Sequence, residues 1–183
     1  MHDFYHMEYS DLRDIFNADC FPRDQRVLKE VGEGDVIVQS CLIDKGGIDS
    51  YLVMRIDPNR KDPFPYFNNG APYHLKCICD YIVFINVDAK IYVMLMELKS
   101  GLGTALTQLE NSECFWNFLQ KSAERKGIDI SNVAGVIKVK LHQPQKACTK
   151  MEIPRYDKGS DVVIYHWAKC RLKRILQLAL QNR

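Results

Sequence analysis

The sequence predicts an α/β protein, more strictly α+β, in which helices flank a central mixed β-sheet. Two apolar runs rich in β-branched residues, Cys77–Ile85 and Ile91–Leu98, enclose a short polar segment and predict a β-hairpin. A long amphipathic helix is expected to follow over Thr104–Lys126, and a further strand over Val133–Leu141. A chain of 183 residues has the length of one domain, so we expect a single domain over residues 1–183.

Two helices and two strands are expected before the hairpin. Apolar residues at helical spacing predict a short helix over Glu8–Ala18, and a proline followed by Arg23–Val31 predicts a second helix. The composition of Asp35–Ile43 and Ser50–Ile56 favours strands. The glycines of Lys45-Gly46-Gly47 lie between these two strands and predict that they form a hairpin.

The end of the chain is expected to hold a basic loop, a strand and a helix. The loop covers residues 142–161, the short strand Val162–Tyr165 and the amphipathic helix Trp167–Gln181. In the preceding long helix, Thr104 is expected to be the N-terminal cap and Gly127 to end the helix.

Charge is distributed unevenly along the chain, although the formal net charge is only +2. Residues 1–60 hold seven Lys/Arg against twelve Asp/Glu, and residues 61–183 hold eighteen against eleven. The first third of the chain is therefore acidic and the rest is basic, a distribution that suits a protein that binds a polyanion on one of its surfaces. Uneven surface charge without such a partner is the simpler interpretation of this feature taken alone.

The seven cysteines are scattered, and their spacing matches no zinc-site pattern. We expect buried free thiols in a reducing cytoplasm. The first residues lack the basic and apolar regions of a signal peptide, and no apolar run is long enough to span a bilayer. The sequence therefore predicts a cytoplasmic protein without a membrane partner.

Asp80, Glu97 and Lys99 form the candidate site. A hairpin turn centred between Asp88 and Ala89 would place Asp80 opposite Glu97, with the Cβ atoms about 5 Å apart. Lys99 lies two residues beyond Glu97 on the same predicted strand, so both side chains leave the same face. Two carboxylates this close repel unless a cation neutralises them, and oxygen ligands favour Mg²⁺ or Mn²⁺.

A lysine beside such a cation could orient a water molecule and stabilise charge that develops on phosphorus. Glu97-Leu98-Lys99 is also a common type of tripeptide at a solvated strand edge. The expected register with Asp80 is what favours the catalytic interpretation.

The pattern Asp80…Glu97-Leu98-Lys99, with its hairpin and the helix that follows, resembles the PD-(D/E)XK nuclease superfamily. The resemblance covers residues 25–141 by element order and implies a restriction-endonuclease-like core of a helix, three strands, a helix and a strand. Residues 162–181 would close this core. The resemblance also implies that Asp80, Glu97 and the Leu98 carbonyl hold the metal and that Lys99 positions the attacking water. Cys79 stands where many members have proline.

Some branches of the superfamily add a glutamate from the helix before the sheet, or a glutamine from the helix after the lysine. Glu30, with Glu33 behind it, is the candidate glutamate and would add a metal ligand. Gln108 is the candidate glutamine and would join the catalytic residues. A solvated charge at a helix end and an ordinary polar helix position are equally good interpretations of these residues.

The most probable partner of such a site is nucleic acid, DNA rather than RNA. Basic residues around the last core strand could follow a phosphate backbone. We expect these residues to contact nucleic acid: Lys138, Lys140, Lys146, Lys150 and Arg155.

The sequence thus predicts a nuclease that depends on Mg²⁺ or Mn²⁺. By analogy alone, such a small nuclease suggests an effector of bacterial antiviral defence or repair, with a protein partner in a multi-component system. A dimer is compatible with the sequence. The alternative is a catalytically inactive module with the nuclease fold, which binds nucleic acid or a protein.

Overall fold

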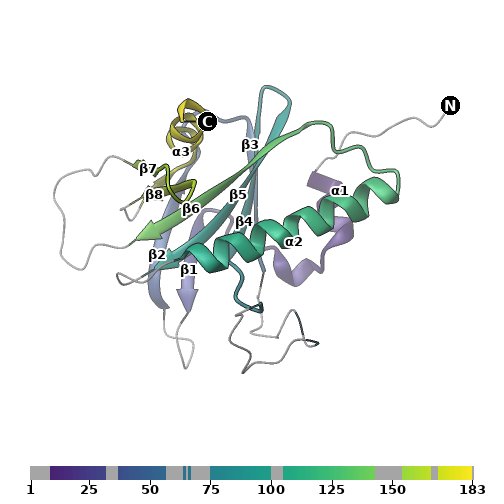
Figure 1. Cartoon of the computed structure of the whole chain (residues 1–183), viewed down its shortest axis with the longest axis horizontal. Coiled ribbons are helices and arrows are strands. Elements are labelled where there is room, and N and C mark those ends of the chain that lie inside the picture. The colour runs from purple at the N-terminus through teal and green to yellow at the C-terminus, as the bar shows by residue number, and fades with distance from the viewer. Residues whose placement is uncertain are drawn as a thin grey trace.

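The computed structural model describes residues 9–31, 37–56, 64, 66, 75–99, 105–142, 154–165 and 169–182. It has an α/β architecture with two mixed sheets and few helices (Figure 1). The elements are α1 (Tyr9–Ile15), the 3-10 turn η1 (Ala18–Cys20), β1 (Val27–Val31), β2 (Ile37–Asp44), β3 (Ser50–Arg55), β4 (Tyr81–Val87), β5 (Lys90–Lys99), α2 (Leu106–Arg125), β6 (Val133–His142), β7 (Arg155–Asp157), β8 (Val162–Tyr165), β9 (Lys169–Arg171) and α3 (Leu172–Gln181).

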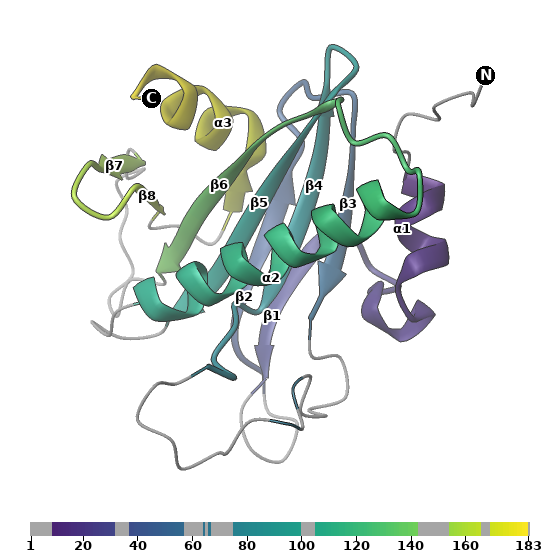
Figure 2. The ribbon, with the colours of Figure 1, turned by 45° about the vertical axis from the view of Figure 1, so that its right-hand side comes forward.

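The larger sheet has six strands in the order β3-β4-β5-β6-β8-β7. β3, β4 and β5 run antiparallel to one another, and α2 then carries the chain across one face so that β6 lies parallel to β5. β8 continues the sheet parallel to β6, and β7 closes it antiparallel to β8. Figure 2 shows α2 lying across one face of this sheet and β1 and β2 behind the opposite face.

The β4–β5 hairpin has the predicted register. Val87 pairs with Lys90 and Tyr81 pairs with Met96, so the turn is centred between Asp88 and Ala89. Both turn residues have positive φ, 51° and 60°, as a two-residue type I′ turn requires. The predicted strand Cys77–Ile85 is shifted, because β4 begins only at Tyr81 and continues to Val87.

The expectation of a helix over Arg23–Val31 is wrong, and so is that of a single sheet. β1 lies in this segment and pairs antiparallel with β2, and β9 adds in parallel to form a three-stranded sheet. The Tyr81 hydroxyl accepts a hydrogen bond from the Lys29 N–H and donates one to the Lys29 carbonyl, both at 2.8 Å. These pairings satisfy the backbone in an extended form, and they override the local preference for a helix.

The predicted hairpin between Asp35–Ile43 and Ser50–Ile56 is also wrong. Both segments are strands, but β2 pairs with β1 and β9, whereas β3 pairs with β4 in the larger sheet. The two glycines, with φ of 60° and 84°, turn the chain from one sheet to the other. This connection lies beside Lys173 of α3.

The remaining predictions are confirmed in part. The loop expected over residues 142–161 contains β7, and β6 extends to His142. The strands expected over Val133–Leu141 and Val162–Tyr165 are β6 and β8. Gly127 ends α2 with φ of 80°, whereas the predicted cap Thr104 lies outside the described residues and the capping position falls on Ala105. The C-terminal helix is shorter than expected, because its predicted first part includes β9.

Each face of the larger sheet is covered by its own hydrophobic core. One core joins the sheet to the β1-β2-β9 sheet and to α3, through residues such as Leu28, Met96 and Ile175. The other core joins the sheet to α1 and α2, through residues such as Leu12 and Trp116. In the described part of the chain, no helix has the length and apolar character needed to cross a bilayer.

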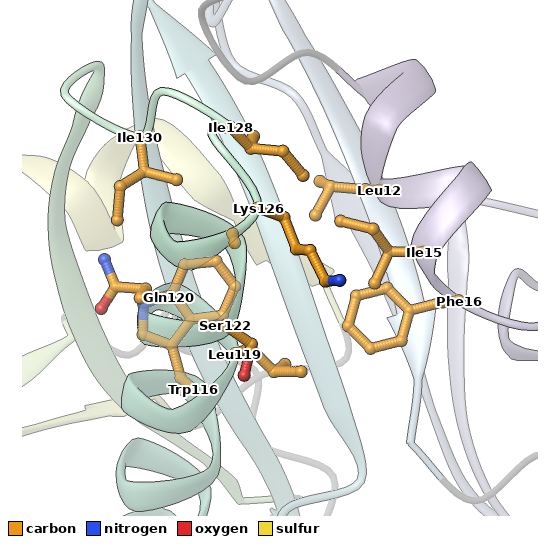
Figure 3. Close-up of a pocket in the computed structure, with 11 residues that line it drawn as sticks. Leu12, Ile15, Phe16, Trp116, Leu119, Gln120, Ser122, Lys126, Ile128 and Ile130 are labelled. Carbon is orange, nitrogen blue, oxygen red and sulfur yellow. The ribbon is translucent and has the colours of Figure 1, made fainter.

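An apolar cavity of about 150 Å³ lies between α1 and the C-terminal half of α2 (Figure 3). Phe16 lies on the α1 side, Leu119 and Trp116 come from α2, and Ile128 and Ile130 line the side formed by the chain after α2. Trp116 is 2% exposed, and its ring meets Phe84 of β4 edge-on at 5.6 Å. Exposed or partly exposed residues such as Ile15, Gln120 and Lys126 also line the cavity, and none of the candidate site residues does.

Candidate active site

Asp80 and Glu97 are brought together where β4 begins and β5 ends. Asp80 directly precedes β4, at the position opposite Glu97 in the hairpin register. The Asp80 N–H donates to Glu97 Oε2 at 3.1 Å, and the Leu98 N–H donates to Asp80 Oδ2 at 2.8 Å. The hairpin thus places the two carboxylates as the sequence predicted.

Glu97 is the centre of the cluster. Its side chain is 2% exposed, and Oε1 accepts hydrogen bonds from both Lys99 Nζ at 2.7 Å and Gln108 Nε2 at 2.5 Å. Lys99 therefore lies on the same face of β5 as Glu97, and Gln108 reaches the pair from the first turns of α2. The step of two residues from Glu97 predicted Lys99, whereas Gln108 was a candidate only through the superfamily resemblance, beside the equally good interpretation of an ordinary polar helix position.

The two carboxyl groups hold their protons more tightly than usual. Burial, together with the negative charge of Asp80, raises the pKa of Glu97 to about 7. Burial also raises the pKa of Asp80, although the Leu98 N–H and the Lys99 charge oppose this. A cation bound between these two carboxyl groups would stabilise their ionised forms.

A row of polar residues on α2 holds this arrangement in place. Gln108 binds Glu97, Asn111 Nδ2 donates to the Cys77 carbonyl at 2.9 Å, and Ser112 Oγ accepts from the Cys79 N–H at 2.7 Å. Residues three and four apart lie on the same side of a helix, so one turn of α2 faces both acid-bearing segments. Sequence reasoning missed Asn111 and Ser112. The sequence pattern that could have identified them is the helical spacing of three polar residues, Gln108, Asn111 and Ser112.

The donor set fits a hard divalent cation. Asp80 and Glu97 offer carboxylate oxygens. The N–H and C=O of one strand residue point to the same side, so the Leu98 carbonyl lies on the side where its N–H meets Asp80. Among the described residues, no cluster of three or more His, Cys, Asp or Glu side chains forms a fuller metal site. The metal set would thus be two carboxylates and one main-chain carbonyl.

The additional glutamate stays a prediction. Glu30 lies on β1 opposite Gln39, not on a helix, and its side chain is outside what the structure describes. The main chain of the preceding Lys29 contacts the hydroxyl of Tyr81. The Tyr81 ring lies in the core on one face of the larger sheet, whereas Ile82 lies in the core on the other face, which α2 covers. Glu33 lies outside the described residues.

No protein-family model matches this chain, and no curated protein or solved structure was found to match it either. The superfamily resemblance of the Asp80, Glu97 and Lys99 pattern therefore remains a proposal.

Two of the predicted basic residues lie in the same cross-strand row as Glu97. Lys140 of β6 is the strand neighbour of Glu97, and burial together with the charges of Lys99 and Arg155 lowers its pKa. Arg155 of β7 lies in the same cross-strand row, two strands beyond Lys140, because Lys140 pairs with Ile164 and Ile164 pairs with Arg155. Lys138 is buried and forms ion pairs with Glu113 at 3.2 Å and with Asp161 at 3.8 Å.

Contacts between these basic residues and nucleic acid stay predictions. Lys138 already has two acidic partners inside the protein. Lys146 and Lys150 lie outside the described residues.

A cleft of about 270 Å³ opens next to Lys140, between the start of α2 and the far strands of the sheet. Its described lining residues come from α2, β6, β8 and the turn before β8: Ala105, Leu106, Leu109, Lys140, Asp157, Ser160, Val162 and Ile164.

Proposed function

We propose that this protein is a nuclease that depends on Mg²⁺ or Mn²⁺ and hydrolyses phosphodiester bonds of nucleic acid. The observation that carries the proposal is the pair Asp80 and Glu97, joined by the Asp80 N–H···Glu97 hydrogen bond, with Lys99 at 2.7 Å from Glu97. A buried and a partly buried carboxylate beside one lysine, at the open end of a hairpin, suit metal-assisted hydrolysis.

The order of elements supports a restriction-endonuclease-like core. β3, β4 and β5 form three consecutive strands, α2 follows the lysine, and β6 adds to the sheet next to β5. This is the order of three strands, a helix and a strand that a PD-(D/E)XK nuclease would have.

Each polar side chain has a role in this proposal. Asp80, Glu97 and the Leu98 carbonyl would hold the cation, which polarises the phosphate and lowers the pKa of its bound water. Lys99 would turn from Glu97 to hold the attacking water and offset negative charge on the phosphate. Gln108 would keep the Glu97 carboxylate oriented while Lys99 is engaged elsewhere.

The basic side of the site supports a polyanionic substrate. Lys140 is the strand neighbour of Glu97 and Arg155 lies two strands further along the same row, where they would offset the charge of the substrate's phosphates. We propose DNA as the main substrate and a defence or repair system as the setting, in which a protein partner would control access.

The test is a cleavage assay beside a metal-binding assay. Purified protein is incubated with linear, circular and single-stranded DNA and with RNA, in Mg²⁺, in Mn²⁺ or in chelator, and Mn²⁺ binding is followed by calorimetry. Asp80→Asn and Glu97→Gln should each lose metal binding and cleavage together. Asp88→Asn, at the exposed turn of the same hairpin, is the matched control and should change neither.

Equal Mn²⁺ binding by wild type and by the variant carrying both Asp80→Asn and Glu97→Gln would refute the metal site. Metal-independent binding of DNA without cleavage would favour the inactive nuclease-fold module instead.

A further inference from the structure

The cleft beside Lys140 lies next to the candidate active site. Gln108, which binds Glu97, lies in the same turn of α2 as Leu106 and Leu109, which line the cleft. Lys140 lines the cleft and is the strand neighbour of Glu97. Neighbouring strands are about 4.8 Å apart, so a ligand at the Lys140 side of the cleft would lie about one nucleotide from the acid pair.

The lining of the cleft combines aliphatic and polar side chains, which suits a group that has both an apolar face and a polar edge. Leu109 and Val162 are 0% and 4% exposed and form the apolar floor, and Leu106 and Ile164 add aliphatic walls. Ser160 and Asp157 add polar atoms from the turn between β7 and β8. Lys140 supplies a positive charge on the side facing Glu97.

The size of the cleft limits what it can hold. Its 270 Å³ lies just below the range of about 300–1,000 Å³ typical of sites for drug-sized ligands. One nucleobase with part of its sugar is a smaller ligand of this kind, whereas a base pair is too large for it.

We propose that this cleft holds one unpaired nucleotide of the strand being cleaved, next to the scissile phosphate, with Lys140 on the connecting phosphate. The inference rests on the proposed nuclease function and names its substrate class: nucleic acid that is single-stranded at the cleavage point. A base inside a duplex is stacked and paired, so reaching the cleft would first require a costly extrusion. Single strands, flaps and frayed ends meet no such barrier.

The cleavage test compares one DNA sequence in three forms: a single strand, a closed circular duplex and a duplex with an unpaired flap. Wild type should cleave the single strand and the flap at least about tenfold faster than the closed duplex. Ser160→Trp, which places a large ring at the polar side of the cleft, should slow cleavage of the single strand by about tenfold or more. Mn²⁺ binding should stay unchanged in this variant, because Ser160 contacts none of the candidate metal ligands.

Ser131→Trp is the matched control. Ser131 and Ser160 each donate to an aspartate in a local turn, to Asp129 and Asp157 respectively, but Ser131 lies away from the cleft. A tryptophan at Ser131 should therefore leave cleavage unchanged. Equal cleavage of single strand and closed duplex by wild type would overturn the inference, as would a Ser160→Trp protein that cleaves single strands at the wild-type rate.

A binding measurement tests nucleotide binding in the cleft separately from the proposed nuclease activity. Thymidine 5′-monophosphate is titrated into the protein with Ca²⁺ and followed by NMR. Binding that shifts the signals of Ile164 and Ser160, and that is lost in Ser160→Trp, supports the cleft even if no substrate is cleaved. Cleavage without any such binding would support the nuclease proposal but would refute nucleotide binding in the cleft.

Discussion

At the residue scale, the ionised form of Glu97 is costly in the metal-free protein. The carboxyl is almost completely buried and lies against Asp80, so burial and like charge raise its pKa from 4.5 to about 7. Between these two values the folded protein keeps a proton that the unfolded chain has released. The contribution of Glu97 to the free energy of unfolding therefore falls as pH rises through this window.

This reasoning gives a pH prediction for protein in chelator. Its free energy of unfolding, measured by chemical denaturation, should decrease by a few kcal/mol between about pH 4.5 and pH 7 and then level off. Glu97→Gln should remove most of the decrease, whereas Glu124→Gln, on the exposed end of α2, should keep it. Mg²⁺ should stabilise the protein more at pH 8 than at pH 5, because the cation replaces the proton. Stability that rises with pH across the window would contradict the argument.

Substitution of Lys99 is expected to affect metal binding and turnover differently from substitution of Asp80 or Glu97. Lys99→Ala removes the ammonium at 2.7 Å from Glu97 but no oxygen ligand, so metal binding should persist while turnover falls by about 10²–10³-fold. Lys99→Arg should restore little activity, because a planar guanidinium does not reproduce a compact ammonium. Rates at saturating Mg²⁺ and Mn²⁺ affinities measure the two effects.

Lys90→Ala, at the exposed opposite end of β5, is the control for Lys99 and should leave both quantities unchanged. A Lys99→Ala protein with the wild-type rate would exclude the proposed role of this lysine.

At the scale of elements, α2 acts as the support of the site. Ser112 and Ser122 both donate to the carbonyl four residues earlier, but only Ser112 also accepts the buried Cys79 N–H. Ser112→Ala should therefore leave that N–H unsatisfied and lower the free energy of unfolding by about 1–3 kcal/mol. It should also weaken Mn²⁺ binding, because Cys79 immediately precedes Asp80.

Ser122→Ala is the matched comparison and should change stability by no more than about 0.5 kcal/mol. Thermal or chemical denaturation and calorimetry of the two variants measure the difference. Equal losses in both would mean that the bond to Cys79 contributes nothing particular to the site.

Elements defined by local pattern were predictable, and elements defined by a distant partner were not. The β4–β5 hairpin follows from two apolar runs around a short turn, and α2 from a long apolar stripe with Gly127 at its end. β1 was mistaken for a helix because its extended form depends on β2 and on the Tyr81 hydroxyl, 52 positions away. No local signal in Val27–Val31 reveals either contact.

The candidate site divides in the same way. The register of one hairpin was enough to place Asp80 opposite Glu97, and a step of two residues was enough to place Lys99. The contacts of Asn111 and Ser112 with residues 77–79 needed the docking of a helix on the sheet. Such docking depends on the packing of both surfaces, which the sequence does not display locally.

At the scale of the whole molecule, Tyr81 joins the two sheets. Its hydroxyl satisfies both the N–H and the C=O of Lys29 on the edge strand β1, and its ring lies in the core that the sheets share. Tyr81→Phe should lower the free energy of unfolding by about 1–3 kcal/mol and speed amide exchange at Lys29. Tyr92→Phe, on the same hairpin, should leave the exchange at Lys29 unchanged. Unaltered protection of Lys29 in Tyr81→Phe would show that the sheets are held together without this bond.

The position of Trp116 gives the protein an optical probe of its own site. The indole is buried between α2 and Phe84, and α2 also carries the row that holds Glu97 and the segment before Asp80. Its fluorescence should be emitted at short wavelength while the helix is seated on the sheet and move to longer wavelength when water reaches the ring. The chain has only one other tryptophan, Trp167. A Trp167→Phe protein would therefore report the assembly of the acid pair in real time, without a label.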